Sequence, residues 1–381
     1  MNHISSLNCF GCGVCAATCP KKTINMHVNK EGFYSPLVDD NNCIECGICL
    51  DVCAFNHDAV CQQELEPFSG AGWSNDADTR YNSTSGGVAF EIAKHLLAEG
   101  YKVCGVRYDI HSQRAEHIIA QDEETLKETV GSKYIQSHTQ EAFSKFVRGE
   151  KYLVVGTPCQ IDSLRRYVQM KKMEQDFVLV DFFCHGVPSD LMWKKYLHEF
   201  GMENLTKVRW RDKRMGWNNS YNMVFQNDAT ETSSRMTQGD LFFKFFLKNR
   251  CLGKACYDDC KYKMTSSAAD IRIGDFWGAK YEAEVKGVNA VIAFTQRGKD
   301  LLLELSTCTI ISESMEVVTD AQMGRCAKRP SSYSYVTEAL RTDASLQEID
   351  KQASRIELFR DEIPQKIKYY SRRIIEKLLC K

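Results

Sequence analysis

Apolar and polar positions alternate along the chain in a pattern that predicts helices and strands in turn. From residue 83 onward, apolar positions recur at the spacing of one helix face, and after Gly100 the stretch 101–108 alternates as a strand does. Two later units have the opposite order, an apolar strand followed by an amphipathic helix, at residues 151–169 and 177–200. Apolar strands that alternate with helices predict an α/β body with a mainly parallel, buried sheet.

The pattern changes near both ends of the body. Residues 61–82 are polar and irregular and therefore predict a linker. Residues 364–381 hold six Lys/Arg and one Glu, with apolar positions at helical spacing. This stretch predicts a basic amphipathic helix that contacts a membrane surface or a partner subunit, or that docks on the body with a solvated polar face.

The composition is that of an ordinary globular protein, apart from its cysteines. Of 381 residues, 43% are hydrophobic and 26% are charged, and the net charge of −1 gives no reason to expect a nucleic-acid partner. The chain starts without the features of a signal peptide, and no apolar run approaches the ~20 residues that cross a bilayer. We therefore expect a cytoplasmic protein whose 18 cysteines serve as metal ligands or redox groups instead of forming disulfides.

Eight of these cysteines form two copies of the spacing C-x2-C-x2-C-x3-C within residues 1–60. This is the run of bacterial ferredoxins, in which the fourth cysteine of each motif binds the cluster of the other motif. Four-cysteine zinc sites usually have two C-x2-C pairs separated by a longer loop, so two 4Fe-4S clusters are favoured over zinc knuckles or a disulfide framework. With three Lys/Arg against six Asp/Glu, this head is slightly acidic. The expected ligands are Cys9, Cys12, Cys15 and Cys53 for the first cluster and Cys43, Cys46, Cys49 and Cys19 for the second.

Candidate chemistry in the body gathers where predicted strands end. Residues 157–160 follow one strand, and Cys184 and His185 follow the next, so these side chains are expected at one edge of the sheet. The alternatives are that each cysteine is a small core residue and His185 a structural one. The turn at residues 85–87 opens a helix, either as an anion cradle or as an ordinary cap. Three further cysteines lie close together downstream: Cys251, Cys256 and Cys260.

Seven short motifs follow one another over most of the chain. They are "TSGGVAF" (84–90), "GSKYIQS" (131–137), "GTPCQI" (156–161), "CHGVPS" (184–189), "RDKRMGW" (211–217), the cysteines of 251–260 and "DIRIGDFWG" (270–278). In this order they resemble the coenzyme F420 hydrogenase/dehydrogenase beta-subunit family, in particular its members with an N-terminal dicluster ferredoxin domain. The resemblance implies a bacterial-type ferredoxin fold followed by an α/β flavin-binding module with a mixed sheet, an α+β or α/β class overall.

The resemblance also implies a division of the chain into five parts. A ferredoxin-like domain and a linker precede the N-terminal and C-terminal parts of the family's catalytic module, and an extension with the basic helix follows them. The boundaries are 1–60, 61–82, 83–150, 151–320 and 321–381.

The family's cofactors are FAD and a further 4Fe-4S cluster, so three clusters are implied for this chain. Cys251, Cys256 and Cys260 are then ligands of the third cluster, although the last spacing is C-x3-C where relatives more often have C-x2-C. The fourth ligand is Cys184, which we favour, or Cys159. His185 is expected near the flavin ring, and Asp275 and Trp277 along the substrate face. The implied flavin contacts are Ser85, Gly86 and Gly87 at the diphosphate, and Lys133, Tyr134, Gln136, Ser137, Thr157, Pro158, Cys159 and Gln160.

The activity that the resemblance implies is that of an oxidoreductase. FAD exchanges an electron pair with a hydride carrier, an F420-type deazaflavin or a similar soluble molecule, and single electrons with iron–sulfur clusters. Two alternatives are a reductase that uses ferredoxin electrons to reduce an organic substrate, and an electron-transfer subunit without a substrate site of its own. Ferredoxin or a partner redox subunit is the expected partner, and in the last alternative the partner is expected to dock on the acidic head or the basic tail.

Overall fold

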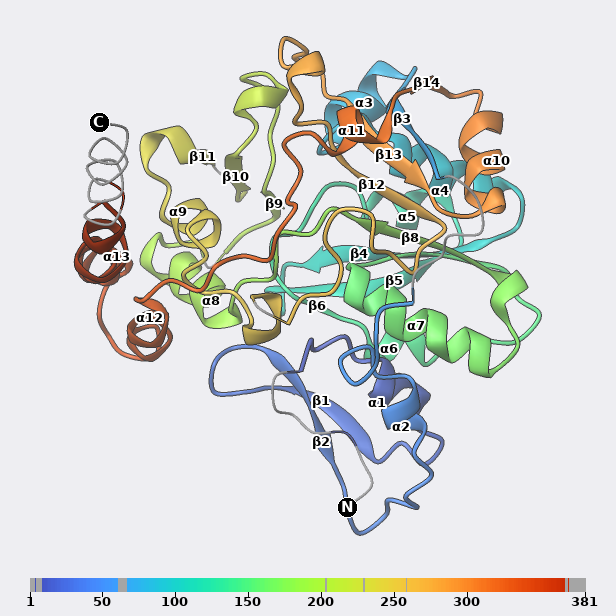
Figure 1. Ribbon diagram of the computed structural model, residues 1–381, viewed down its shortest axis with the longest axis horizontal. Coiled ribbons are helices and arrows are strands. Elements are labelled where there is room, and N and C mark those ends of the chain that lie inside the picture. The colour runs from blue at the N-terminus through green and yellow to red at the C-terminus, as the bar shows by residue number, and fades with distance from the viewer. Residues whose placement is uncertain are drawn as a thin grey trace, which may run out of the picture.

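The computed structural model describes residue 4 and residues 9–60, 67–202, 204–228, 230–257, 259–366 and 369. A small head made by the first 60 residues lies against a larger α/β body (Figure 1). The head contains α1 (Val14–Thr18), β1 (Ile24–Val28), β2 (Tyr34–Val38) and α2 (Ile48–Asp51). The two strands pair as an antiparallel hairpin. Each helix follows a glycine with positive φ, Gly13 at 73° and Gly47 at 78°, which lets the chain turn sharply out of each cysteine loop.

The body is built on one mixed sheet. In chain order its strands are β3 (Phe68–Ser74), β4 (Lys102–Asp109), β5 (Arg114–Ala120), β6 (Ser137–His138), β7 (Tyr152–Val155), β8 (Phe177–Phe182), β12 (Ile271–Asp275), β13 (Asn289–Ala293) and β14 (Cys308–Ser312). These nine strands of the described residues have the spatial order β14-β3-β13-β12-β8-β7-β4-β5-β6. The central strands β12, β8, β7 and β4 are parallel, whereas β13, β3 and β14 add antiparallel neighbours on one side and β5 on the other. The mixed sheet is confirmed, and the expected parallel pairing holds at its centre.

Helices cover both faces of this sheet, because successive strand side chains point to opposite sides. On β7, Leu153 packs into the cluster under the helices of one face, and Val154 into the cluster under those of the other. The first face carries α4 (Val88–Ala98), α5 (Glu123–Lys127) and α10 (Gln296–Glu304), and the second carries α6 (Gln140–Phe143) and α7 (Pro158–Met170). Val14 and Val52 of the head belong to the second cluster, so head and body share a buried core.

Part of the predicted linker belongs to the sheet. Of residues 61–82, the structure describes 67–82, and these form β3, between β13 and β14, and α3 (Ala77–Asn82). The strand sequence "FSGAGWS" carries small residues where it is buried, and a Cβ on Gly70 would lie 2.5 Å from the carbonyl oxygen of Ile311. Small side chains give no apolar alternation, so the sequence could not show that this segment packs between two strands.

A second lobe lies beside the sheet, to the left in Figure 1. Its core is aromatic and includes Trp193, Trp210 and Phe242. The C-terminal extension packs here, because Arg250, fully buried, donates to Asp350 and Glu357 at 2.6 Å each. The elements of this part are α8 (Asp190–Glu199), β9 (Lys207–Arg209), β10 (Asn222–Gln226), β11 (Glu231–Arg235), α9 (Leu241–Leu247), α12 (Tyr333–Ala339) and α13 (Leu346–Glu357). The short helix α11 (Met315–Thr319) packs on β3 and β13 of the main sheet, where Val318 clusters with Ala71 and Ala290.

The expected basic C-terminal helix falls largely outside the described residues. The chain is helical as far as residue 366, and residues 367–368 and 370–381 are not described. None of the helices in the described part of the chain has the length and apolar character to span a membrane.

Candidate functional site

The four cysteines that the spacing assigns to the first cluster lie together at the junction of head and body. We call Cys9, Cys12, Cys15 and Cys53 the first cysteine site. Burial raises the pKa of the Cys9 thiol to about 12, and the charges of Cys12 and Cys53 contribute to this shift. The pKa of Cys15 lies well above its ordinary value because of burial first and of Cys12, Cys9 and Cys53 next. Buried thiols in this surrounding favour a bound metal cluster, whose positive charge stabilises thiolates.

Glycine allows the first cysteine loop to lie directly on the body. A Cβ on Gly11, which has φ 68°, would come within 2.2 Å of Nε2 of Gln136, and one on Gly13 within 2.1 Å of Oγ1 of Thr139. Gln136 Nε2 donates to the carbonyl oxygen of Phe10 at 3.1 Å, and Thr139 donates to that of Cys12 at 2.8 Å. Gln136, an expected flavin contact, therefore fastens the head instead.

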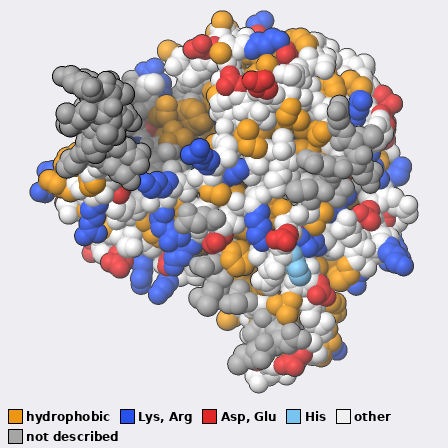
Figure 2. Space-filling model, viewed as in Figure 1, with side chains coloured by type: hydrophobic (Ala, Val, Ile, Leu, Met, Phe, Trp, Pro, Cys, Tyr) orange, Lys and Arg blue, Asp and Glu red, His pale blue; other side chains and the backbone are white. Residues whose placement is uncertain are grey.

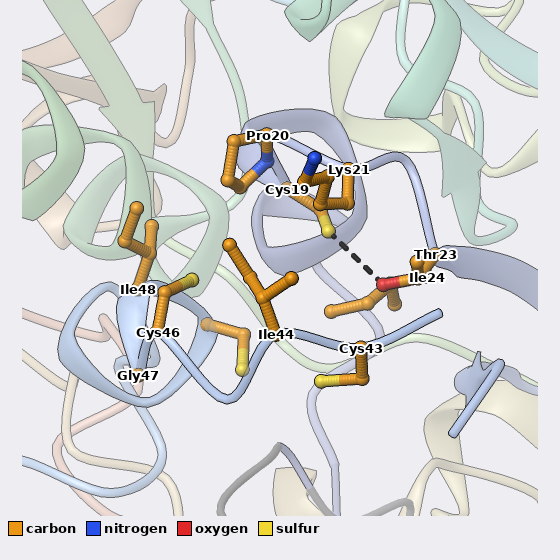
Figure 3. Close-up of a pocket in the computed structure, with 11 residues that line it drawn as sticks. Cys19, Pro20, Lys21, Thr23, Ile24, Cys43, Ile44, Cys46, Gly47 and Ile48 are labelled. Atoms are coloured by element: carbon orange, nitrogen blue, oxygen red, sulfur yellow. Dashed lines mark hydrogen bonds between the residues drawn. The ribbon is translucent and has the colours of Figure 1, made fainter. Parts of the chain in front are cut away.

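The second cysteine site lies at the outer end of the head. Cys19, Cys43, Cys46 and Cys49 line one cavity there (Figure 3), and they are the four that the spacing assigns to the second cluster. Cys46 is exposed, whereas Cys49 is buried. The Cys19 sulfur and the Thr23 hydroxyl form a hydrogen bond of 3.3 Å at the rim.

A third group of cysteines is brought together by the sheet. Cys159 begins α7 directly after β7, and Cys184 follows β8, so the ends of two parallel neighbours present both thiols. Burial raises the pKa of Cys256 to about 12, and the charges of Cys184 and Cys260 act in the same direction. Burial likewise raises the pKa of Cys159, with the charges of Cys12, Cys184 and Cys256 adding to it. We call Cys159, Cys184, Cys256 and Cys260 the third cysteine site.

Cys251, expected as a ligand of the third cluster, packs in the aromatic core of the second lobe. Its side chain is 2% exposed there. Burial raises its pKa to about 12, and the charge that acts on it is that of Arg250. The backbone explains the separation: the Cys251 carbonyl accepts from Ser189 N at 2.8 Å, while Gly253 N donates to Val187 O at 3.0 Å and directs the following residues toward Cys184. Cys159 and Cys184, expected as alternatives, are both present in the group.

The first cysteine site neighbours each of the other two. Cys49 of the second site is among the residues whose charge raises the pKa of Cys15, after burial and the cysteines of its own site. Cys12 of the first site acts in the same way on Cys159 of the third. Within the described residues, no three Cys, His, Asp or Glu side chains converge on the position of a single metal ion. A four-iron cluster instead takes four cysteines around a larger body, which each of these groups supplies.

A large cavity opens in the body, away from the cysteines. It is lined from α3, α4, α5 and the β9 segment, and its walls carry seven Lys/Arg against four Asp/Glu. Lys133 lines it and donates to Val130 O at 2.9 Å, and burial lowers the pKa of its amine to about 7. Trp210 also lines it, and its indole N–H is buried without a hydrogen-bond partner among the described residues. The excess of cations suits an anionic ligand.

Arg211 joins this cavity to the residues expected at the substrate face. Its guanidinium donates to Asp275 Oδ2 at 3.1 Å and to the Tyr134 hydroxyl at 3.0 Å, and it lies 4.3 Å from the ring centroid of Tyr221. Trp277 stacks on Tyr221 with an interplanar angle of 13°. The motif that contains Arg211 did not by itself indicate a role for this residue, although a buried arginine needs such a carboxylate partner.

The remaining expected contacts have structural partners. His185 is hydrogen-bonded to Asn249 at 2.7 Å and to Met323 at 3.1 Å, and burial lowers the pKa of its ring. Ser85 donates to Val288 O at 2.6 Å, and Gly86 packs so closely that a Cβ would lie 2.4 Å from Gly72 O. The other five also have structural roles: Gln160 donates to Ser137 at 3.1 Å, Thr157 N donates to Gln160, Pro158 begins α7, and Gly87 caps α4.

Comparisons with known proteins agree with the motifs. Residues 149–317 match the model for the C terminus of the coenzyme F420 hydrogenase/dehydrogenase beta subunit, and residues 70–144 match the model for its N terminus. Residues 8–57 match the 4Fe-4S dicluster domain, which confirms the ferredoxin-like head. A chain of the F420-reducing nickel–iron hydrogenase complex from Methanosarcina barkeri is similar at 13% identity and a TM-score of 0.47, over 81% of this chain and 96% of that one. No curated protein matches the sequence.

Proposed function

Because the chain belongs to the coenzyme F420 hydrogenase/dehydrogenase beta-subunit family and carries a 4Fe-4S dicluster domain, we propose that it is an iron–sulfur flavoprotein oxidoreductase. It transfers electrons between a hydride carrier, an F420-type deazaflavin or similar molecule, and its clusters through FAD. The observation that carries the proposal is the succession of three neighbouring cysteine sites from the head into the body, which also holds a cation-rich cavity.

The residues present fit three four-iron clusters, each of which passes one electron at a time when bound. The first and second sites supply the two ferredoxin tetrads, and the third site supplies four thiols from the ends of β7 and β8 and from the loop after α9. Backbone N–H groups support the sulfurs: Gly11 N donates to Cys9 Sγ at 3.1 Å. Such bonds stabilise thiolates and tune the potential of the cluster they hold.

The cavity fits a dinucleotide such as FAD, which exchanges an electron pair with a hydride donor and single electrons with clusters. Arg211 supplies positive charge for a diphosphate, the Lys133 amine supplies a hydrogen-bond donor, and so does the indole N–H of Trp210, which has no partner among the described residues. The stacked rings of Tyr221 and Trp277 form a flat aromatic surface behind Arg211, which lines the cavity while neither ring does. Asp275 keeps this surface in place, because it also accepts from Trp217 Nε1 at 2.7 Å.

The second site is where a redox partner would dock. Cys46 is exposed beside Ile44, which is 56% exposed, and Leu37, which is 61% exposed. Asp39, Asp40 and Glu45 are exposed in the segment that carries these residues, and Figure 2 shows scattered acidic side chains on the head, at the bottom of the view. An apolar patch with an acidic rim favours a ferredoxin or redox subunit that presents basic residues around its own cluster. The same face serves the second candidate function, an electron-transfer subunit without its own substrate.

Anaerobically reconstituted protein tests the proposal. We expect about twelve iron atoms and one FAD per chain, from three four-iron clusters and one flavin. F420H2 should bleach the flavin absorbance, and a ferredoxin should then accept the electrons. Iron without flavin would refute the enzyme and leave the electron-transfer subunit. A flavin that ferredoxin reduces but F420H2 does not would assign the chain to the reductases of organic substrates.

Replacement of Arg211 by glutamine should weaken FAD binding by about tenfold or more, because a hydrogen bond to a charged group contributes about 1.5–3 kcal/mol. Flavin released on dilution, measured by fluorescence, gives the dissociation constant. Arg214→Gln is the matched control, since Arg214 belongs to the same motif but pairs with Asp212 and Glu231 away from the cavity. Equal flavin loss in both variants would remove Arg211 from the binding site.

A further inference from the structure

A buried polar group lies between the first and third cysteine sites. Asp162 and Ser163 follow Cys159 by three and four residues on α7, so the three side chains share one face of the helix. This face meets the head, and both polar residues are fully buried. A single helical turn therefore carries a ligand of the third site and polar groups directed at the first.

Ser163 contacts the first site directly. Its hydroxyl oxygen accepts from Cys12 Sγ at 3.3 Å and from Ala54 N, the residue after Cys53, at 3.1 Å. The position of two ligands of the first site is thus fixed relative to Cys159. Electron transfer between the two sites needs such a fixed separation.

Asp162 is bonded to segments from both sites. Its Oδ2 accepts from the Tyr262 hydroxyl at 2.8 Å and from Val60 N at 3.2 Å, and its Oδ1 accepts from Arg166 Nε at 2.8 Å. Tyr262 follows Cys260 by two residues, and its ring lies 6.0 Å from that of Phe10, which follows Cys9. The carboxylate therefore lies where the chain segments of the two sites meet.

The charge of Asp162 reaches the first site. It is one of the groups that raise the pKa of Cys12 to about 11, after burial and Cys53. For Cys159 of the third site, the charges that contribute most to the raised pKa, after burial, are those of Cys12, Cys184 and Cys256. In a buried environment a carboxylate charge is weakly screened, so it opposes any further negative charge placed beside it.

We propose that Asp162 is a positioning residue of the electron path, whose buried negative charge disfavours an electron on the first cluster. The inference rests on the proposed function, because it requires a cluster at both sites. The step it controls moves one electron: one cluster is oxidised, the other is reduced, and no bond or proton changes place.

The test is a redox titration of the reconstituted full chain at pH 8, monitored by electron paramagnetic resonance. Asp162→Asn keeps the shape of the side chain and removes its charge. The midpoint potential of one cluster should rise by about 59 mV, which for a one-electron couple is about a tenfold change in favour of the reduced first cluster. The same shift should appear when Asp162→Asn is combined with Cys256→Ala. Since Cys256→Ala removes the third cluster, a shift that persists belongs to the first or the second cluster.

Two further variants separate charge from structure. Arg166→Gln removes the cation paired with Asp162 and keeps the bonds to Tyr262 and Val60, so the same midpoint should fall. If Asp162→Asn does not retain its clusters, the direction of the midpoint shift in Arg166→Gln tests the proposal in its place. Glu313→Gln is the matched control, since Glu313 accepts from Lys280 at 2.6 Å and Tyr281 at 3.0 Å beside the far edge strand β14, and it should shift nothing.

The outcomes distinguish the inference from the function on which it rests. Unchanged midpoints in Asp162→Asn, with about twelve iron atoms retained, would overturn the role of Asp162 and leave three clusters in place. Shifts of the same sign in Asp162→Asn and Arg166→Gln would show a structural disturbance and overturn it as well. Wild-type protein with about eight iron atoms would instead refute the third cluster itself.

Discussion

Replacement of Cys256 by alanine should lower the iron content of the reconstituted protein from about twelve to about eight atoms per chain, because a four-iron cluster needs all four of its thiolates. Cys159→Ala and Cys184→Ala should give the same value, since all three side chains belong to the third cysteine site. The first and second clusters should remain, because their eight ligands lie in the head. Iron analysis together with the resonance signals of the reduced clusters measures the loss.

Cys251→Ala is the matched control for this series. Cys251 lies in the same stretch of chain as Cys256, and burial raises the pKa of each thiol to about 12, but Cys251 packs in the aromatic core. Its replacement should leave the iron content near twelve atoms. If Cys251→Ala instead removed four iron atoms and Cys159→Ala removed none, the ligand set expected from the motif would be right and the grouping in the structure would not.

The contrast between the two kinds of cysteine site shows how far local sequence determines a site. The ferredoxin spacing places each tetrad within the short chain that carries it, so the spacing alone is enough to assign both sites of the head. The third site depends on which strands become neighbours. The strand ends predicted that Cys159 and Cys184 meet, because both follow apolar strands at one edge of the sheet.

The spacing of the cysteines along the chain could not show that Cys251 lies apart from the third cysteine site. Its position is set by Arg250, which bonds Glu357 more than 100 residues away and holds this part of the chain on the C-terminal extension. Local spacing also could not show that β3 is a strand of the sheet. Its small residues fit closely against the backbone carbonyls of β14 and therefore give no apolar alternation. Gln136 is the clearest case of a motif residue with an unforeseen partner, because its amide bonds a head that the motifs alone present as a separate domain.

A salt bridge beneath the third site has the largest expected effect on stability. Arg272 on β12 faces Asp181 on β8 across the parallel pair, and both side chains are fully buried. Two bonds of 2.7 and 2.6 Å join them. The remaining guanidinium nitrogen, Nη1, donates to Met264 O at 2.7 Å and to Tyr262 O at 3.2 Å. Arg272 therefore holds the segment that follows Cys260 as well as the sheet.

Arg272→Leu should lower the free energy of unfolding by about 3–5 kcal/mol, because it leaves the Asp181 carboxylate buried without its cation. Urea denaturation monitored by circular dichroism measures the change. In the double variant Arg272→Leu/Asp181→Leu most of this loss should be recovered, since two apolar side chains replace the buried pair. The third cluster should be lost in both variants, because neither can hold the carbonyls of residues 262 and 264. Stability that returns together with about twelve iron atoms would show that the segment after Cys260 is positioned without Arg272.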